Sequence, residues 1–339
     1  MNIIEILKLI SPEITDSFFR RYSILRTVDH LAPVGRRVLA DTLQTGERII
    51  RTELEALKQL DLIETGASGV SLTARGQGLL TAMAPYMLEL LGLPTMERQV
   101  SEHLGIPRVI LVPGDSSADP LVQRELGRAA ARVLVQEIRE GDIIAITGGT
   151  TMSAVADSVH SQRHRVTVVP GRGALGERVE IQANTIAAKL AQALGGNYRL
   201  LHAPDNLSRH ALEELVQEPG IAEVLALIHR STLLVHGIGD ALEMAARRQA
   251  PPERIAALKE LNAAAETLGY YFNHQGQIVW QANSIGLGID DLENIKTVIV
   301  VAGGTAKAQA IRAVAAHYKW NVLVTDQGAA EAILQGPSV

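Results

Sequence analysis

The 339-residue sequence predicts an α/β protein, with an N-terminal winged helix-turn-helix followed by a Rossmann-like domain on an open, mostly parallel sheet. Three patterns predict this fold. Helices and a small hairpin occupy the start of the chain, strands alternate with helices beyond Ile106, and a Gly-Gly-Thr turn occurs twice after an apolar run. Apolar residues make up 47% of the chain, enough for a large core in each part.

The head of the chain has the element order of a winged helix-turn-helix. Apolar residues recur at helical spacing in three stretches, and the tight turn Gln44-Thr45-Gly46 separates the second from the third. Two short strands around a glycine-bounded turn follow. The expected elements are helices over residues 17–32, 36–43 and 47–60 and strands over 62–65 and 70–73.

The pattern changes after the head. Residues 74–104 keep helical spacing, with a break at Gly92-Leu93-Pro94, so we expect a winged-helix domain over 1–90 and a second domain over 91–339. Alternating strands and helices in the second domain favour a sheet covered on both faces. Strands are expected at 108–112, 143–147, 165–169, 199–202, 232–236, 297–302 and 321–325, with helices such as 121–137 and 182–194 between them.

The repeated turn has the chemistry of an anion site. Residues 144–151 read Ile-Ala-Ile-Thr-Gly-Gly-Thr-Thr, and residues 299–306 read Ile-Val-Val-Ala-Gly-Gly-Thr-Ala. Glycines allow a tight turn and close approach to a ligand, and the free N–H groups of the following helix favour phosphate. Two copies predict a crevice in which two helix N-termini face one ligand. We expect the first copy to be the main cradle, and the second mainly to deliver Lys307. The cradle residues are Gly148, Gly149, Thr150 and Thr151.

Further side chains fit the same ligand. Arg172 lies in a glycine-rich stretch after a strand, where its planar fork suits a phosphate. Gln182 can contact sugar hydroxyls, and Glu266 can accept hydrogen bonds from them. Arg247 and Arg248 lie downstream of another strand end. Each has a plainer interpretation, because turn glycines and solvated surface charges are common.

The head carries a basic face. Residues 17–58 hold eight basic and five acidic side chains, whereas the net charge of the whole chain is -5. In a helix-turn-helix the second helix enters the major groove, which places Thr45, Arg48 and Arg51 near base edges. Arg36 and Arg37 open the preceding helix, where phosphate contacts are usual. The alternative is a solvated basic face or a winged helix used for protein contacts.

Several classes of protein are disfavoured by the composition. The chain has no cysteine, which excludes disulfides, thiolate metal sites and cysteine nucleophiles. No apolar run has the length of a membrane span, and residues 1–5 lack the basic start of a signal peptide. No G-x-G-x-x-G motif opens the first strand–helix unit of the second domain, and the chain has no Walker lysine pattern. We expect a cytoplasmic protein without metal, cofactor or membrane contact.

Seven motifs, in order along nearly the whole chain, resemble the SorC/DeoR-type sugar-responsive transcriptional regulators. Within that family they are most similar to the group that controls central glycolytic genes in Gram-positive bacteria. The motifs are Pro33-Val34-Gly35-Arg36-Arg37, Thr147-Gly148-Gly149-Thr150-Thr151, Arg172-Gly173-Ala174-Leu175-Gly176-Glu177, Gln182-Ala183-Asn184-Thr185, Val235-His236-Gly237-Ile238-Gly239, Gly269-Tyr270-Tyr271-Phe272-Asn273 and Val324-Thr325-Asp326-Gln327-Gly328-Ala329-Ala330.

The resemblance implies a repressor that binds operator DNA, and whose DNA binding is relieved by fructose 1,6-bisphosphate in the second domain. It also implies that this domain resembles sugar-phosphate isomerases and deaminases in fold. We expect a homo-oligomer, either a dimer or a tetramer. One departure is Gly46, where a Ser or Thr helix cap is more usual. By motif, the effector-binding residues are Gly148, Gly149, Thr150, Thr151, Arg172, Gln182, Arg247, Arg248, Glu266 and Lys307.

Two alternatives remain at the level of the sequence. The first is an enzyme acting on sugar phosphates, but the Asp-Gly-His run of the deaminases is missing, because Ala241-Leu242-Glu243 follows Asp240. We therefore expect no catalytic residues. The second is a regulator that senses another phosphosugar. The position of Arg247 and Arg248 distinguishes a ligand with one phosphate from a ligand with two. If the pair lines the crevice at the far end from Thr150 and Thr151, a ligand with two phosphates is expected; if the pair lies outside the crevice, one phosphate is enough.

Overall fold

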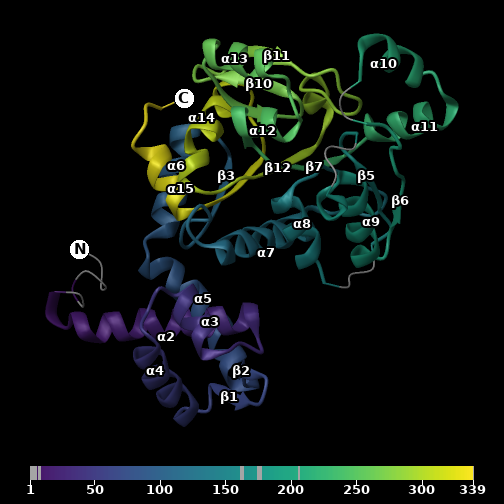
Figure 1. The fold of residues 1–339 in the computed structure, drawn as a ribbon. Helices are drawn as coiled ribbons and strands as arrows, with labels where there is room; N and C mark the ends of the chain where they lie inside the picture. Colours follow the sequence, from purple (N-terminus) through teal and green to yellow (C-terminus); the bar gives the residue numbers. More distant parts are fainter. Residues whose placement is uncertain (1–5, 7–8, 161–163, 174–177, 205–206, 339) are drawn as a thin grey trace. The chain divides into compact units, whose positions relative to one another are not determined.

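The computed structural model describes residues 6, 9–160, 164–173, 178–204 and 207–338 (Figure 1). The chain divides into two compact units, Met1–Pro94 and Thr95–Val339, which we call the head and the body. The division lies slightly beyond the 90/91 boundary expected from sequence. Two parts of the sequence interpretation, residues 1–5 and the motif residues 174–177, lie outside the described residues.

The head is a winged helix-turn-helix, as predicted. The helix expected over 17–32 begins at Pro12, earlier than expected, with proline in the first turn, where a missing N–H costs nothing. The strands β1 and β2 pair antiparallel, with Ile63 opposite Leu72. The bounds are α2 (Pro12–Leu31), α3 (Arg36–Thr42), α4 (Glu47–Gln59), β1 (Ile63–Gly66), β2 (Gly69–Leu72) and α5 (Ala74–Leu90).

The core of the head holds α4 in place. Ile50, Leu54 and Leu57 pack against the second half of α2 and against the hairpin. Gly46 precedes α4 in an extended conformation and gives no side-chain cap, as expected. Glu53 on α4 is only 6% exposed and accepts hydrogen bonds from Arg20 and Arg21 of α2. Ion pairs to this buried carboxylate therefore hold α4 against α2.

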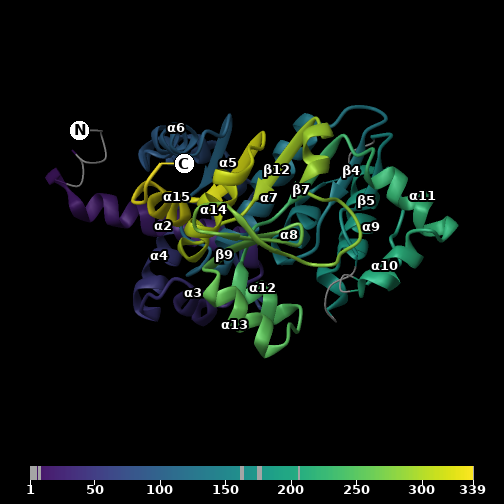
Figure 2. The ribbon, with the colours of Figure 1, turned by 90° about the horizontal axis from the view of Figure 1, so that it is seen from above.

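The body is built on a seven-stranded sheet in which every paired neighbour is parallel. The strand order is β3-β13-β12-β7-β4-β5-β6, and Figure 2 shows β12, β7, β4 and β5 side by side. The strands are β3 (Arg108–Val112), β4 (Ile143–Ile146), β5 (Thr167–Pro170), β6 (Asn197–Tyr198), β7 (Leu233–His236), β12 (Thr297–Val301) and β13 (Val322–Asp326).

Helices follow most of these strands. A core cluster joins α7, α8 and α9 to the sheet, mainly through Ala, Val, Leu and Ile side chains. The helices of the body are α6 (Leu93–Leu104, which begins at the end of the head), α7 (Pro120–Glu137), α8 (Thr150–Ser158), α9 (Ala183–Leu194), α10 (Arg209–Leu215), α11 (Pro219–Ile228), α12 (Ala241–Arg247), α13 (Pro252–Glu260), α14 (Ala308–His317) and α15 (Gln327–Leu334), with 3-10 turns η1 (Val179–Ile181), η2 (Asp290–Asn294) and η3 (Thr305–Lys307).

One predicted strand was misplaced. The sequence predicts a strand over 199–202, but β6 covers only Asn197–Tyr198. The physical reason is the side chain of Asn184, which accepts a hydrogen bond from Leu201 N (3.0 Å) and donates one to Leu201 O (3.0 Å). The backbone of Leu201 is therefore bonded to an amide side chain rather than to β5.

A second, antiparallel sheet was not predicted at all. Its order is β11-β10-β9-β8, and its strands are β8 (Gly239–Asp240), β9 (Ala263–Thr267), β10 (Tyr270–Asn273) and β11 (Ile278–Gln281). The alanines of β9 favour a helix when read locally, and packing overrides that preference. Leu268 and Gly269 join β9 to β10, both with positive φ, as a tight two-residue hairpin requires.

The order of the parallel strands determines where a ligand can bind. From β4 the chain proceeds outward to β5 and β6, and from β7 it proceeds the opposite way to β12 and β13. Loops after adjacent strands that run to opposite sides leave a crevice at the carboxyl ends. The first Gly-Gly-Thr loop follows β4, at this switch point.

Candidate functional site

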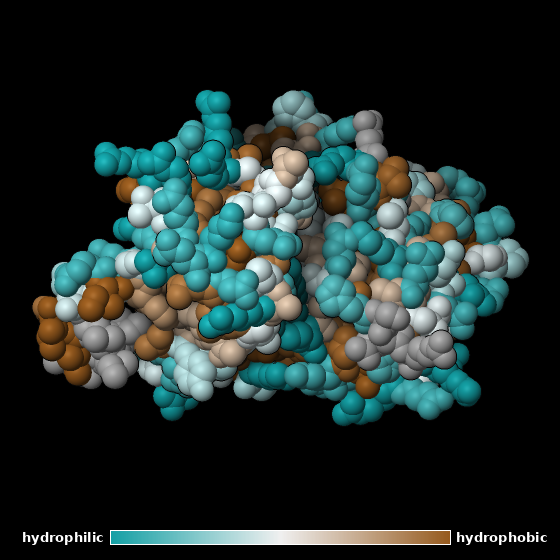
Figure 3. All heavy atoms as spheres, turned by 90° about the horizontal axis from the view of Figure 1, so that it is seen from below, coloured by the Kyte–Doolittle hydropathy of each residue, from teal (hydrophilic) through white to brown (hydrophobic). Residues whose placement is uncertain are grey.

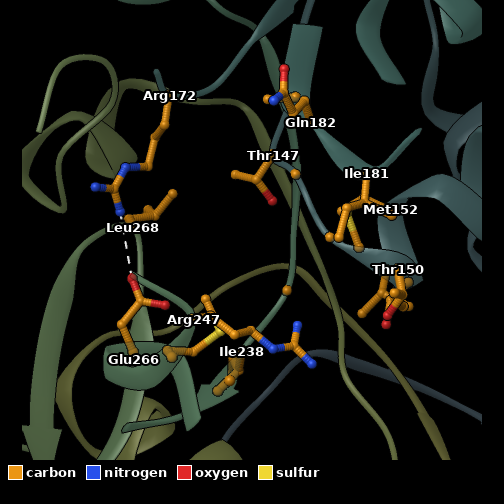
Figure 4. A pocket seen from close by; sticks show the side chains of 18 of the residues that line it. Thr147, Thr150, Met152, Arg172, Ile181, Gln182, Ile238, Arg247, Glu266 and Leu268 are labelled. Carbon is orange, nitrogen blue, oxygen red and sulfur yellow. Dashed lines mark hydrogen bonds and ion pairs between the residues drawn. The ribbon is translucent and has the colours of Figure 1, made fainter. Parts of the chain in front are cut away.

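A pocket of about 410 Å³ lies at the carboxyl ends of the central strands. The loops after β4, β5, β7 and β12 line it, together with η1, α12 and β9. Figure 4 shows Glu266 and Thr150 on opposite sides of the pocket, with Arg247 reaching between them. All ten residues expected to bind an effector line this one pocket, although their binding role stays a prediction: Gly148, Gly149, Thr150, Thr151, Arg172, Gln182, Arg247, Arg248, Glu266 and Lys307.

The first Gly-Gly-Thr loop forms an open helix N-terminus. Gly149 has φ +119°, a conformation that L side chains rarely adopt, and its N–H donates to Ile181 O (2.8 Å). α8 begins at Thr150, and the N–H groups of a first helical turn lack intrahelical acceptors. Gln123 of α7 donates to the hydroxyls of Thr150 (2.8 Å) and Thr151 (3.4 Å). The hydroxyl hydrogens are therefore left for a ligand.

The second Gly-Gly-Thr loop is closed by carboxylates of the protein itself. The N–H of Gly304 donates to Asp326 Oδ2 (2.7 Å). Thr305 donates to Asp115 through its N–H (3.1 Å) and through its hydroxyl (2.6 Å). The broad expectation of two helix N-termini facing one ligand was thus wrong, because aspartates occupy the anion position of the second copy. The narrower expectation, that this copy mainly brings Lys307 to the crevice, agrees with the structure. The contribution of this copy to the pocket is Lys307 together with Val301.

Charged side chains cluster on the side of the pocket opposite α8. Glu266 Oε1 accepts from Arg248 Nη2 (2.8 Å) and from Gly269 N (2.7 Å), and lies 3.5 Å from Arg172 Nη1. The side chains of Glu266, Arg172 and Arg248 are at most 7% exposed. Buried arginines held by a carboxylate have fixed positions, so their charge is in place before an anion arrives.

The loop that carries Arg172 is pinned by a distant segment. Gly173 N donates to Ile285 O (3.0 Å), and Leu287 N donates to Gly171 O (2.9 Å). The guanidinium of Arg172 also donates through Nε to Ser284 Oγ (2.9 Å). The segment 284–287 thereby holds both the backbone and the side chain of this arginine.

Two further cations, Arg247 and Lys307, line the same pocket. Arg247 Nη2 bonds Glu243 Oε1 (2.5 Å), and both side chains are about half exposed. Burial lowers the pKa of Lys307, the nearby Glu243 opposes that shift, and Arg247 adds to it. An ammonium that is partly desolvated and close to another cation gains from an incoming anion.

Sequence reasoning missed several lining residues. Arg178 precedes η1 and adds a fifth cation to the pocket. Its signal was present in the sequence, since it follows the glycine-rich Arg172 stretch directly. Met152, Met244, Ile238 and Leu268 supply apolar surface, and no sequence pattern distinguishes them from core residues.

The predicted DNA-contact residues all lie on one part of the head. Arg36, Arg48 and Arg51 line a shallow depression together with Glu47, and Arg37 is exposed nearby on α3. Thr45 is partly buried, and its hydroxyl donates to Leu43 O (2.9 Å). Ile50 and Leu57 on the opposite face of α4 are buried, so the two arginines of α4 face outward.

Comparison with known families assigns both units. Residues 18–87 match the family described as "CggR N-terminal DNA binding domain", and residues 89–335 match "Putative sugar-binding domain". The central glycolytic genes regulator of Priestia megaterium is 41% identical over 337 residues, which is 98% of each chain. That of Bacillus subtilis is 39% identical over 336 residues, 98% of this chain and 99% of the relative.

The chain belongs to the SorC family of sugar-responsive transcriptional regulators. A solved SorC family regulator from Enterococcus faecalis superposes with a TM-score of 0.67 at 41% identity, covering 71% of this chain and 99% of that one. The full-length sorbitol operon regulator SorC of Klebsiella pneumoniae gives a TM-score of 0.67 at 16% identity, over 89% of this chain and 94% of that one. The second likeness concerns the fold alone.

Among the described residues, no group of three His, Asp or Glu side chains is placed to hold a metal ion. No single described helix is long and apolar enough to cross a membrane, and one bent pair, α5 with α6, passes by length and composition only.

Proposed function

We propose that this SorC family member is a cytoplasmic repressor of glycolytic genes, without catalytic activity, that leaves its operator when fructose 1,6-bisphosphate binds the body pocket. The observation that carries the proposal is the distribution of charge in the pocket. Among the described lining residues, five are cationic and one, Glu266, is a carboxylate. The cations are Arg172, Arg178, Arg247, Arg248 and Lys307.

Two separate anion positions favour a ligand with two phosphates. The first position is the open N-terminus of α8, with the hydroxyls of Thr150 and Thr151. The second is the buried arginine cluster around Glu266, on the opposite side in Figure 4. Arg248 belongs to this cluster and Arg247 lies between the two ends, so the arginine pair lines the pocket away from Thr150. An arginine pair at this position, away from Thr150 and Thr151, is the arrangement expected for a ligand with two phosphates.

The middle of the pocket suits the carbon chain of a sugar. Met152, Met244, Ile238 and Leu268 give it apolar walls, and Gln182 offers an amide to hydroxyls. Phosphate binding at both ends would link α8 to the antiparallel sheet that carries Glu266. A ligand that binds one arrangement of these parts better than another shifts their populations, and operator binding shifts with them.

Calorimetry on the full-length protein tests the site. We expect fructose 1,6-bisphosphate to bind, and Arg172→Ala or Thr151→Ala to lower its affinity about 10-fold or more, the loss typical of a charge-assisted hydrogen bond. The matched control is Arg199→Ala, an exposed arginine of the body outside the pocket. Unchanged affinity in both pocket variants would reject the site assignment.

Fluorescence anisotropy on DNA tests the response. The probe is a duplex selected from random DNA by the protein itself, titrated with and without fructose 1,6-bisphosphate, fructose 6-phosphate and ribose 5-phosphate. We expect the bisphosphate to weaken DNA binding more than either monophosphate. A complex that none of the three affects would overturn the proposed response, and turnover of any of them by the purified protein would revive an enzymatic role.

A further inference from the structure

Helix α2 of the head extends beyond the core that it helps to build. In the second half of α2, Ile24, Leu25 and Val28 are at most 2% exposed and pack inside the head. In the first half only Thr15 is buried. Ile14 lies two and four helical turns before Arg21 and Val28, so it is on the same face as these residues. The face that is buried in the second half is therefore open to solvent in the first.

Large apolar side chains occupy this open face and the turn before it. Ile14 is 60% exposed and Phe18 is 40% exposed. Ile6, Leu9 and Ile10 precede them and are 38%, 75% and 74% exposed. In Figure 3, brown apolar atoms gather at the left of the view, on the side where Figure 1 shows α2. We call these five side chains the N-terminal stripe.

The area of the N-terminal stripe matches what a pairing of two copies needs. The exposed fractions correspond to roughly 500 Å² of apolar surface in each copy. Pairing two stripes would remove roughly 1,000 Å² from water, the size at which specific interfaces begin. An exposed apolar patch of this size on a protein is usually a contact surface.

The charges beside the stripe are complementary to those of a second copy. Glu13 and Arg20 are seven residues apart, so they flank the stripe on the same side. In an antiparallel pair related by a two-fold axis, Glu13 of one copy lies beside Arg20 of the other, and the contact occurs twice. Arg20 is 37% exposed and bonds Glu53 through Nη1 only at 3.2 Å, which leaves donors at its outer edge.

We propose that the N-terminal stripe is a head-to-head dimer contact, in which the first half of α2 pairs antiparallel with that of a second copy of the chain. A winged helix-turn-helix reads one half-site, so a two-fold pair of heads presents two α4 helices to a two-fold operator. The pair fixes their spacing. This contact is independent of which sugar phosphate binds the body.

Single cysteines test the contact directly, because the chain has none of its own. Ile14→Cys, Ser17→Cys and Phe18→Cys each place one thiol along the stripe. Leu60→Cys is the control, at an exposed apolar residue directly after α4. Under mild oxidation of the full-length protein we expect covalent dimers from at least one stripe position, since a two-fold axis brings equivalent residues within disulfide distance. Cross-linking no faster than in Leu60→Cys would overturn the proposal.

A charge substitution tests the consequence for DNA. In the double variant Ile14→Glu with Phe18→Glu we expect operator affinity to fall at least 10-fold, with the affinity for fructose 1,6-bisphosphate unchanged. Leu60→Glu should change neither, and Ile14→Leu with Phe18→Leu should retain operator binding, which separates the contact from a folding defect. Parental operator affinity in the folded double glutamate variant would contradict the proposal, whatever the body binds.

Discussion

The two Gly-Gly-Thr loops of the body have nearly the same sequence, but they differ in what their backbone N–H groups bind. The loop after β4 opens α8 toward the pocket, with Gln123 bonded to its threonine hydroxyls. The loop after β12 has its N–H groups bonded to Asp115 and Asp326. The N–H groups of the first loop are therefore available to an anionic ligand, whereas those of the second loop already donate to carboxylates of the protein.

The difference shows that the neighbours of a glycine turn decide its use. Both loops follow a buried parallel strand, and both have a glycine at positive φ. Asp326 ends β13, which pairs with β12, and Asp115 follows β3, which pairs with β13 on its other side. β4 lies on the opposite side of β12, beyond β7. Sheet order therefore delivers carboxylates to one loop and leaves the other to a ligand.

The largest effect on stability is expected from removing the Asp326 carboxylate, which accepts hydrogen bonds from the second Gly-Gly-Thr loop. Asp326 is fully buried and accepts four hydrogen bonds, from Gly304 N, Ser116 N, Ser116 Oγ and Ala329 N. Asp326→Ala leaves three backbone donors without an acceptor, so we expect a loss of about 4 kcal/mol in the free energy of unfolding. Urea denaturation of the full-length protein measures it. Asp119→Ala is the control, because Asp119 accepts only Leu121 N and caps α7 (2.9 Å). Equal losses in the two variants would mean that the carboxylate does not close the second loop.

Lys307 is the point at which the closed loop meets the pocket. We expect Lys307→Met to weaken fructose 1,6-bisphosphate binding roughly 10- to 100-fold, the range for a lost ionic contact. Because burial lowers the pKa of Lys307, its ammonium costs stability at neutral pH, and the variant should unfold at the same or a higher temperature.

The same shift predicts a pH dependence. As pH rises through the lowered pKa of Lys307, below the usual value of about 10.4, the ammonium becomes neutral and effector affinity falls. Calorimetry from neutral pH to about pH 10 should show this fall in the parent and in the exposed control Lys296→Met. A fall that persists unchanged in Lys307→Met would assign it to another group.

A smaller effect is expected at the open loop. Gln123→Ala removes the amide that orients the hydroxyls of Thr150 and Thr151. We expect effector affinity to fall by roughly 3- to 10-fold, the size of one neutral hydrogen bond, without a large change in stability. Gln136→Ala on the same helix is the control, since Gln136 is exposed and accepts from Arg108 instead. Equal effector affinities in the two variants would show that binding does not depend on the hydrogen bonds from Gln123 to the threonine hydroxyls.

The sequence predicts which residues line the pocket better than it predicts their hydrogen-bond partners. Local patterns identify Thr150, Arg172 and Lys307, because each sits just beyond a strand end, and all of them line the pocket. The closing of the second loop could not be foreseen, since Asp115 and Asp326 reach it only through the order of strands in the sheet. The acidic loop after β3 was visible in the sequence, but its target was not.

The antiparallel sheet marks a second limit of sequence reasoning. Its strands are short, and β9 is rich in alanine, so neither periodicity nor propensity indicates a strand there. Glu266 is nevertheless placed by this sheet, opposite Tyr271 of β10. A position that depends on pairing between segments cannot be derived from either segment alone.

Gly269 shows how far the control of this pocket reaches beyond its walls. It does not line the pocket, but it has φ +82°, and a Cβ there would come within 2.4 Å of the guanidinium of Arg172. A genetic screen for chains that still bind DNA yet ignore the effector should therefore recover substitutions at Gly269. Suppressors of such mutants would map to the neighbours of Arg172 and not to the ligand contacts. Codons for residues that never contact the ligand therefore also control the response to the effector.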